Sequence, residues 1–432
     1  MLTKSQLIII GIVAFVIVVF VLIFNGIIPG LQQEGAKTGG QVVKSPPKIP
    51  LEFWGVYDNQ ESYKTAFSAF GAANPGVEFN YKKFDNEKEY FNAILEALAT
   101  GEGPDIMMIP SNGLTKHISR LQPAPAQVNI NFLRQSFPQV VEQDFVAQGN
   151  VYALPLSIDT LVLFYNRDLL DQAAINPPTT WEDFKKITIQ ITKLTAGKTI
   201  ASPGAAIGGS SKSVHNAPDI LMMLMAQNGT TMTNNQGGPA FASAQGENAL
   251  KFYTQFSDTT GDSYVWNDQL QYSLDAFAQE KVPFIIDYAS AIPEIKARNQ
   301  FLNFAAAPAP QSKEAQKTVS YSHYWGYTVP KQSKKQDLAW RFIANLATQQ
   351  AGAYMTATKK PPALRELINQ NLNDIGLGIF AKQALTARSW AQPDPEAVKT
   401  IFDQMIVSVL ENKVSITNAL GQAQTQVSAL RK

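Results

Sequence analysis

Aromatic and carboxylate side chains recur near the predicted ends of strands, where they could bind a hydroxyl-rich small molecule. Residues 49–57 read as a strand that carries Trp54 and ends beside Asp58, and residues 105–109 read as a strand followed by Ser111. Flat aromatic faces suit the C–H faces of sugar rings, whereas carboxylates and amides suit their hydroxyl groups in a partly dry cleft. This combination of residue types indicates a binding site for a polar small molecule.

The candidate ligand-binding residues share an aromatic face or a polar tip beside a predicted strand end or within a polar stretch. They are Trp54, Asp58, Ser111, Asp159, Trp266, Asp287, Tyr288, Trp325 and Trp390, with Tyr57 as a further aromatic platform. Each aromatic residue has an alternative role in the core, with its polar tip satisfied by a neighbour. We expect that alternative for Trp181 and Trp340, which lie on the faces of predicted helices.

Asp159 follows a bend between two apolar runs. Pro155 interrupts the first run, and because proline cannot donate to a sheet ladder, it disfavours a central, uninterrupted strand. We predict a strand that leaves one sheet, crosses a short bend and enters another sheet over residues 161–165. A lone acid between apolar segments must be paired, hydrogen-bonded or hydrated, and a cleft between two lobes would supply the water. The alternative is a hinge acid that caps backbone amides.

Alternating strands and helices would position these residues. Residues 49–109 read as strand, helix, strand, helix, strand, which calls for a parallel sheet with helices on both faces. Ligands gather beyond the carboxyl ends of the strands in such sheets. A second region begins near Ser157, and its predicted strand over 281–288 ends at Asp287 and Tyr288.

Several phrases occur in an order and spacing that resemble the extracellular solute-binding proteins of bacterial ABC importers, the maltose-binding-protein-like group. The phrases cover residues 152–156, 159–160, 165–169 and 178–184, and further similar phrases run from about residue 50 to the end. The resemblance implies an α/β, two-lobed periplasmic-binding-protein-like fold (type II). Each lobe would be a mixed sheet flanked by helices. The apolar run near the N-terminus adds one transmembrane helix before the two lobes. The resemblance also implies a ligand-contacting acid at Asp159.

The expected organisation has an N-terminal signal anchor, a linker and two discontinuous lobes. The ranges are 1–29 for the signal anchor or transmembrane helix, 30–48 for the flexible linker, 49–156 plus 288–331 for lobe 1, and 157–287 plus 332–432 for lobe 2. The apolar run from Leu7 to Phe24 spans about 27 Å as a helix, near the thickness of a bilayer core. No Ala-x-Ala site follows it, which favours an uncleaved anchor over a cleaved signal. Lys4 precedes the run, which favours a cytoplasmic N-terminus and an exported body.

Composition excludes several classes of function. Lys plus Arg is 36 and Asp plus Glu is 35, so no charge excess suggests nucleic acid as a partner. Cysteine is absent, which removes disulfides, thiolate metal sites and the lipid-modified cysteine that many members of the similar family carry. The three histidines lack metal-ligand spacing, and no Gly-x-Ser-x-Gly elbow occurs. We therefore expect no enzyme activity, no cofactor and no metal.

The combined prediction is a membrane-tethered receptor whose body lies on the extracytoplasmic face of the cell membrane. It would capture a small solute, with a sugar or oligosaccharide as first choice, by hinge closure and deliver it to an ABC transporter permease. One alternative is a polyamine or another non-sugar solute bound by the same fold. A second is an exported glycan-active enzyme or adhesin, because the sequence alone does not exclude paired acids for glycoside hydrolysis.

Overall fold

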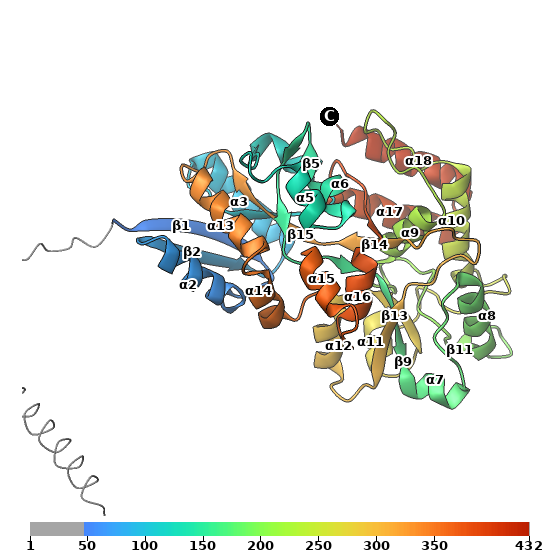
Figure 1. The fold of residues 1–432 in the computed structure, drawn as a ribbon. Coiled ribbons are helices and arrows are strands. Elements are labelled where there is room, and N and C mark those ends of the chain that lie inside the picture. The colour runs from blue at the N-terminus through green and yellow to red at the C-terminus, as the bar shows by residue number, and fades with distance from the viewer. Residues whose placement is uncertain (1–46, 432) are drawn as a thin grey trace, which may run out of the picture. The chain divides into compact units, whose positions relative to one another are not determined.

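The first part of the body folds as alternating strands and helices. A computed structural model describes residues 47–431 of the protein. The first elements are β1 (Ile49–Val56), η1 (Gln60–Tyr63), α2 (Lys64–Ala73), β2 (Val77–Phe84), α3 (Glu87–Thr100) and β3 (Met107–Pro110). β1 and β2 pair in parallel, and Phe53 bridges Ile106 in parallel just before β3. The parallel arrangement predicted for residues 49–109 is confirmed (Figure 1).

α3 shows why this sequence forms these elements. The Asn86 side chain accepts a hydrogen bond from the Glu89 amide at the helix start, which satisfies one of the free N–H groups there. Tyr90, Ile94 and Leu98 recur at helical spacing and are buried against the sheet. Burial of each such side chain contributes about 1.5–3 kcal/mol. Gly101 ends the helix in the left-handed conformation that glycine adopts without strain.

A late strand, β15 (Trp325–Pro330), completes this part of the fold. β15 runs antiparallel to β3, to β4 (Leu121–Gln122) and to β7 (Leu154–Pro155). The helices and short strands around it are α4 (Leu114–His117), η2 (Ile118–Arg120), α5 (Ile130–Ser136), α6 (Gln139–Phe145), β5 (Val146–Ala147), β6 (Asn150–Val151), α13 (Gln336–Ala347), α14 (Ala351–Thr358) and α15 (Arg365–Asn371). Together these elements enclose the first of two hydrophobic cores, hereafter core 1.

The chain leaves core 1 through the bend predicted at Pro155. Pro155 lies opposite Gly326 at the edge of the β15 sheet. The chain then forms β8 (Asp159–Thr160), which pairs with β14 (Ser320–His323), and continues into β9 (Val162–Asn166). β14 also pairs with β16 (Ala387–Arg388), so three short strands link the two parts of the body. The predicted passage from one sheet into another is confirmed.

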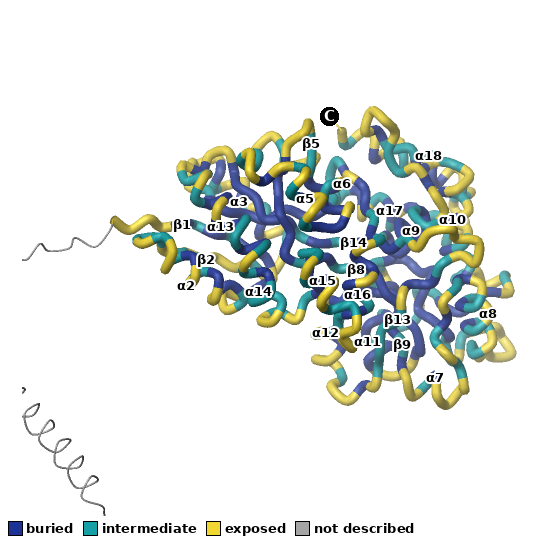
Figure 2. Tube along the Cα trace, in the orientation of Figure 1, coloured by how far each residue is buried: buried dark blue, intermediate teal, exposed yellow. Residues whose placement is uncertain are grey.

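The second hydrophobic core, core 2, surrounds β9. β9 lies between β12 (Phe284–Asp287) and β13 (Phe304–Pro308), antiparallel to both. Its other elements are α7 (Arg167–Ala173), α8 (Trp181–Ile191), β10 (Lys193–Leu194), β11 (Ile200–Ser202), α9 (Ala217–Gln227), α10 (Ala244–Thr254), η3 (Gln255–Ser257), α11 (Ser273–Ala278), η4 (Ala289–Ala291), α12 (Ile292–Arg298), α16 (Gly378–Ala384), α17 (Pro395–Leu410) and α18 (Ile416–Ala429). Buried residues follow the inner strands and exposed residues follow outer helices such as α7 (Figure 2). Thr180 caps α8 by accepting from the Asp183 amide.

The chain stays with core 2 after β12. Ile295 and Leu302 are buried in core 2, and β13 takes the free edge of β9. The return to core 1 comes with β14, which pairs with β8, and with β15, which pairs with β3. The residue ranges expected for the two lobes stay a prediction.

The predicted anchor over residues 1–29 and nearly all of the predicted linker over 30–48 lie outside the described residues. Within residues 47–431, no helix combines the length and apolar character needed to cross a membrane.

Candidate functional site

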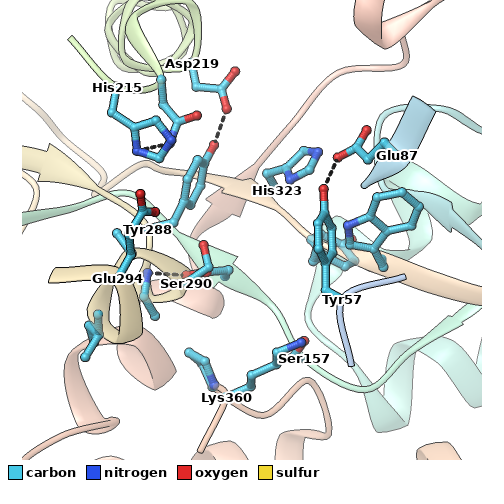
Figure 3. A pocket seen from close by; sticks show the side chains of 18 of the residues that line it. Tyr57, Glu87, Ser157, His215, Asp219, Tyr288, Ser290, Glu294, His323 and Lys360 are labelled. Carbon is cyan, nitrogen blue, oxygen red and sulfur yellow. Dashed lines mark hydrogen bonds between the residues drawn. The ribbon is translucent and has the colours of Figure 1, made fainter. Parts of the chain in front are cut away.

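A cavity of about 700 Å³ is walled by residues from both cores. One side, the Tyr57 wall, comprises Tyr57, Asp58, Glu87, Trp325 and Lys360. The opposite side, the Tyr288 wall, comprises His215, Asn216, Asp219, Tyr288 and Glu294. Figure 3 shows side chains of both walls pointing into the same space. The volume is in the range of sites for small molecules such as sugars.

Tyr57 holds an exposed aromatic ring in the cavity at the end of β1. Its φ of 71° places it in the left-handed region, which costs a residue with a Cβ about 1–2 kcal/mol. Its hydroxyl donates to Oε1 of Glu87 at 3.0 Å, and its ring meets Trp325 edge-on with the centroids 6.1 Å apart. Loss of hydration and the nearby Glu87 charge raise the pKa of Tyr57. An aromatic residue held in strain with 47% of its surface exposed is typical of a ligand contact.

Asp58 forms the polar base of the Tyr57 wall. Its carboxylate accepts from Nζ of Lys360 at 2.6 Å and from the hydroxyl of Tyr354 at 2.7 Å. Only 8% of Asp58 is exposed, so nearly all of its hydration is replaced by these partners. Such pairing is what a buried carboxylate requires. The Lys360 ammonium remains at the cavity surface as a donor for ligand oxygens.

Tyr288 and Asp219 form a second tyrosine–carboxylate pair on the opposite wall. The Tyr288 hydroxyl donates to Oδ2 of Asp219 at 2.8 Å. Loss of hydration and the Asp219 charge raise the pKa of Tyr288 well above its ordinary value, so the phenol stays protonated. Because this proton is committed to Asp219, the phenol oxygen and the carboxylate present acceptors to the cavity. The Tyr57–Glu87 pair has the same polarity on the facing wall.

Asp159 lies at the cavity, but both of its carboxylate oxygens already have partners. Oδ1 accepts from the Ala289 amide at 2.8 Å and Oδ2 accepts from the Ser290 amide at 2.9 Å. These bonds tie β8 to η4 and correspond to the alternative role of an acid that caps backbone amides. Loss of hydration raises the pKa of Asp159 to about 6, although the two amides oppose the rise. A carboxylate has about four lone-pair sites, so further acceptor capacity remains for a ligand.

Four of the nine predicted site residues line the cavity: Asp58, Asp159, Tyr288 and Trp325. Trp325 lies between the Tyr57 ring and that of Phe91, onto which it stacks with the centroids 6.0 Å apart. Asp58, Tyr288 and Trp325 were predicted because they lie near strand ends, and Asp159 because it follows the bend at Pro155.

The other five predicted residues lie outside the cavity lining. Trp54 lies on β1 beneath Lys82, whose Nζ is 4.2 Å from the ring centroid. Ser111 and Asp287 are buried and form hydrogen bonds within the protein. Trp266 and Trp390 are packed in core 2, where their indole N–H groups donate to Ser213 and to the sulfur of Met222. Trp181 and Trp340 are buried as expected.

Several residues that line the cavity were not predicted as site residues from the sequence. They are Glu87, His215, Asn216, Asp219, Glu294 and Lys360. Glu87 had a usable signal, because it follows the carboxyl end of β2, and that end lies beside the end of β1 in the parallel pair. His215 and Lys360 had none, because they reach the cavity through loops whose course depends on packing far away in the chain.

Among residues 47–431, no cluster of three or more acidic, histidine or cysteine side chains could hold a metal ion. The cavity presents hydrogen-bonding groups and aromatic faces.

Comparison with known proteins gives consistent matches. The family model of bacterial extracellular solute-binding proteins matches residues 65–371. The chain is 24% identical to the maltodextrin-binding protein of Bacillus subtilis over 376 residues, which cover 78% of this chain and 80% of that protein. It is 23% identical to a protein of Brucella abortus named as a binding protein, but the match spans only 66% of that relative and 64% of this chain.

A solved structure supports the fold. The cyclic α-maltosyl-1,6-maltose-binding protein from Arthrobacter globiformis superimposes with a TM-score of 0.73 at 18% identity, over 89% of this chain and 99% of that chain. At this identity, the likeness concerns the α/β fold of mixed sheets and helices.

Proposed function

The chain belongs to the family of bacterial extracellular solute-binding proteins, and from this premise we propose that its cavity captures a saccharide. The observation that carries the proposal is the matched polarity of the two walls. The Tyr57–Glu87 and Tyr288–Asp219 pairs both direct acceptors into one cavity of about 700 Å³. Sugar hydroxyls are donors that suit these acceptors, and the exposed Tyr57 ring offers a surface for a C–H face.

The proposed mechanism is hinge closure of a two-lobed, type II binding protein. The three short strands β8, β14 and β16 connect the two cores, and both cores supply cavity residues. A ligand that contacts both walls would bind the closed state more tightly than the open state and so shift the population towards closure. The closed protein would then deliver its ligand to an ABC transporter permease.

Tethering to the membrane is part of the same proposal. The apolar run from Leu7 to Phe24 is long enough to span a bilayer. With Lys4 before the run, the cavity-bearing body would lie on the extracytoplasmic face. Detection of the intact N-terminal peptide by mass spectrometry of the membrane fraction would test the uncleaved anchor.

A polyamine or other cationic solute is the second candidate ligand. Glu87 and Asp219 line the cavity, and within residues 47–431 neither has a lysine, arginine or histidine at ion-pair distance. Two carboxylates without cations could neutralise ligand ammonium groups. A saccharide is favoured because the exposed Tyr57 ring suits a sugar C–H face, and because the Lys360 ammonium at the cavity would repel a cationic ligand.

A ligand panel tests the proposal directly. The purified full chain is heated with maltotetraose, other oligosaccharides, polyols and polyamines, and the melting temperature is recorded. A ligand at one hundred times its dissociation constant stabilises the folded protein by about 2.7 kcal/mol. No shift in melting temperature with any saccharide would contradict the proposal, and a shift with polyamines alone would favour the second candidate. In a separate assay, formation of products from glycans by the purified protein would favour an exported enzyme.

A matched pair of variants locates the binding site. Glu87→Gln removes a cavity charge and should weaken saccharide binding about tenfold, because hydrogen bonds to charged groups contribute about 1.5–3 kcal/mol. Glu89→Gln makes the same change on the outer surface of α3 and should leave affinity unchanged. Equal effects of the two substitutions would contradict the site.

A further inference from the structure

We infer that Asp287 is a positioning residue that sets, from behind the Tyr288 wall, which hydrogen-bonding atoms His215 and Asn216 present to the ligand. The inference rests on the proposed function, because it concerns the same cavity. It assigns to a residue outside the cavity the control of two residues inside it.

Asp287 makes three hydrogen bonds from a position that solvent barely reaches. Oδ2 lies 2.7 Å from Nδ1 of His215, and Oδ1 accepts from Nδ2 of Asn216 at 3.0 Å. Oδ1 also accepts from the backbone amide of Tyr288 at 2.8 Å. Only 1% of Asp287 is exposed, and its place opposite Val162 in the β12–β9 ladder fixes its backbone. One buried carboxylate therefore contacts three members of the Tyr288 wall.

The carboxylate decides the tautomer of His215. An ionised acid only accepts, so Nδ1 of His215 must carry the proton that it shares with Asp287. Nε2 then has no hydrogen-bond partner within residues 47–431, and His215 lines the cavity. A neutral His215 thus offers the ligand an acceptor at Nε2, and a protonated His215 offers a charged N–H donor.

Asn216 is oriented by the same carboxylate. Its amide nitrogen donates to Asp287, which leaves its amide oxygen as the acceptor available to a ligand. Asn216 has a φ of 55° at the start of α9, a left-handed conformation that asparagine tolerates better than most residues. Its conformation and its side chain are thus both fixed, as expected of a residue prepared for recognition.

Charges around His215 come from several elements. Asp287 lies at the end of β12 and Glu294 on α12, while Lys399 projects from α17. The Tyr272 ring lies edge-on to the His215 ring, with the centroids 5.9 Å apart. Asp219 lies in the first turn of α9, which begins just after His215.

Burial and Lys399 disfavour the imidazolium, but the hydrogen bond and charge of Asp287 outweigh them, so the pKa of His215 is raised above its ordinary value. Glu294 adds to the rise. Charge-assisted hydrogen bonds are stronger than neutral ones, so saccharide affinity should increase as pH falls and His215 becomes protonated.

The test reads the imidazole and the affinity separately. In the isotope-labelled full chain, NMR titration reports the tautomer and pKa of His215, assigned by single His→Gln variants. We expect the neutral wild-type ring to carry its proton on Nδ1. In Asp287→Asn, the proton should move to Nε2 and the pKa should fall. Asp105→Asn, a buried carboxylate of core 1 outside the cavity lining, should leave the tautomer and pKa of His215 unchanged.

Maltotetraose affinity supplies the second readout. We expect the wild type to bind about fivefold more tightly near pH 5.5 than near pH 8, and Asp287→Asn to lose most of this difference. His215→Gln, at a partly exposed site, should lose it too and serves if Asp287→Asn does not fold. A wild-type neutral ring protonated on Nε2, or an unchanged His215 tautomer in Asp287→Asn, would overturn the inference. If no saccharide binds, the proposed function fails while the imidazole measurement still decides the role of Asp287.

Discussion

The Nζ atom of Lys360 lies 2.6 Å from Oδ1 of Asp58, so an ion pair joins the end of β1 to the loop after α14. The two residues are 302 positions apart in the sequence. Asp58 also accepts from the hydroxyl of Tyr354, and that ring stacks on Tyr63 at a centroid distance of 5.7 Å. The Tyr57 wall is thus fixed to the interior of core 1 through a buried carboxylate, and this attachment can be tested.

Replacing Lys360 by methionine should destabilise the protein by about 1–3 kcal/mol, because it leaves a buried carboxylate without its cation. The lower end of this range applies because solvent screens the partly exposed Lys360. Urea unfolding of the purified protein measures the loss. Lys359→Met is the matched control, since the neighbouring lysine also lines the cavity but forms no ion pair within residues 47–431. Equal losses in both variants would contradict a specific role for the ion pair.

Replacing Tyr57 by glycine should separate binding from stability. Glycine relieves the left-handed strain, worth about 1–2 kcal/mol, but gains freedom in the unfolded chain, worth about 0.5–1 kcal/mol. The free energy of unfolding should therefore change by no more than about 1.5 kcal/mol, while saccharide affinity falls at least tenfold with loss of the ring. Calorimetric titration and urea unfolding on the same sample check both effects.

Tyr57→Phe is the companion variant. It keeps the ring but loses the hydroxyl that donates to Glu87, so it should weaken binding less than Tyr57→Gly. Strong destabilisation by Tyr57→Gly would show that the ring supports the fold rather than the ligand.

The sequence predicted elements whose signals are local. Pro155 marks the change of sheet as predicted, because proline cannot continue a central ladder. Residue type did not separate core from cavity. Trp266 is buried in core 2, whereas Trp325 lines the cavity. A tryptophan near a predicted turn can have either role, because the role depends on which distant segments pack around it.

Asp287 shows a second limit of prediction from the sequence. Its place at a strand end was predicted, but whether its carboxylate faces the cavity or lies behind it depends on a one-residue register. In the structure Tyr288 faces the cavity and Asp287 turns to His215.

His117 should make the protein sensitive to mild acid. Burial lowers the pKa of His117 to about 4, with smaller contributions from Lys116 and Arg120, and its ring stacks on Phe91 at 4.8 Å. The unfolded chain binds the proton more readily, so stability is complete above about pH 6.5 and falls towards pH 4. Between pH 7.5 and pH 5, the titration of His117 should lower the free energy of unfolding by about 2 kcal/mol. His117→Phe, compared by urea unfolding at both pH values, should remove that part of the loss; an unchanged slope would contradict the assignment.

Asp144 should act in the opposite direction over the same pH range. Its carboxylate accepts from the hydroxyls of Tyr324 and Ser389 and is almost completely buried. Loss of hydration raises its pKa to about 7, although both hydroxyls oppose the rise. The folded protein therefore binds this proton more readily than the unfolded chain, and stability from this residue increases as pH falls from about 8 towards 4.

Asp144→Asn mimics the neutral acid and should remove the dependence. Relative to this variant, the free energy of unfolding of the wild type should increase by about 2–3 kcal/mol as pH falls from 8 to 5, as measured by urea unfolding. Glu142→Gln is the control, a change at a partly exposed carboxylate on the same helix. The hydrogen bond from Arg134 lowers the pKa of Glu142, so Glu142 titrates below this range and the variant should keep the wild-type slope. Because Ser389 follows β16 and Tyr324 follows β14, the proton on Asp144 bears on the strands that join the two cores. If Asp144→Asn and the wild type show the same slope, the carboxylate is ionised in the folded protein and the predicted link to these strands is wrong.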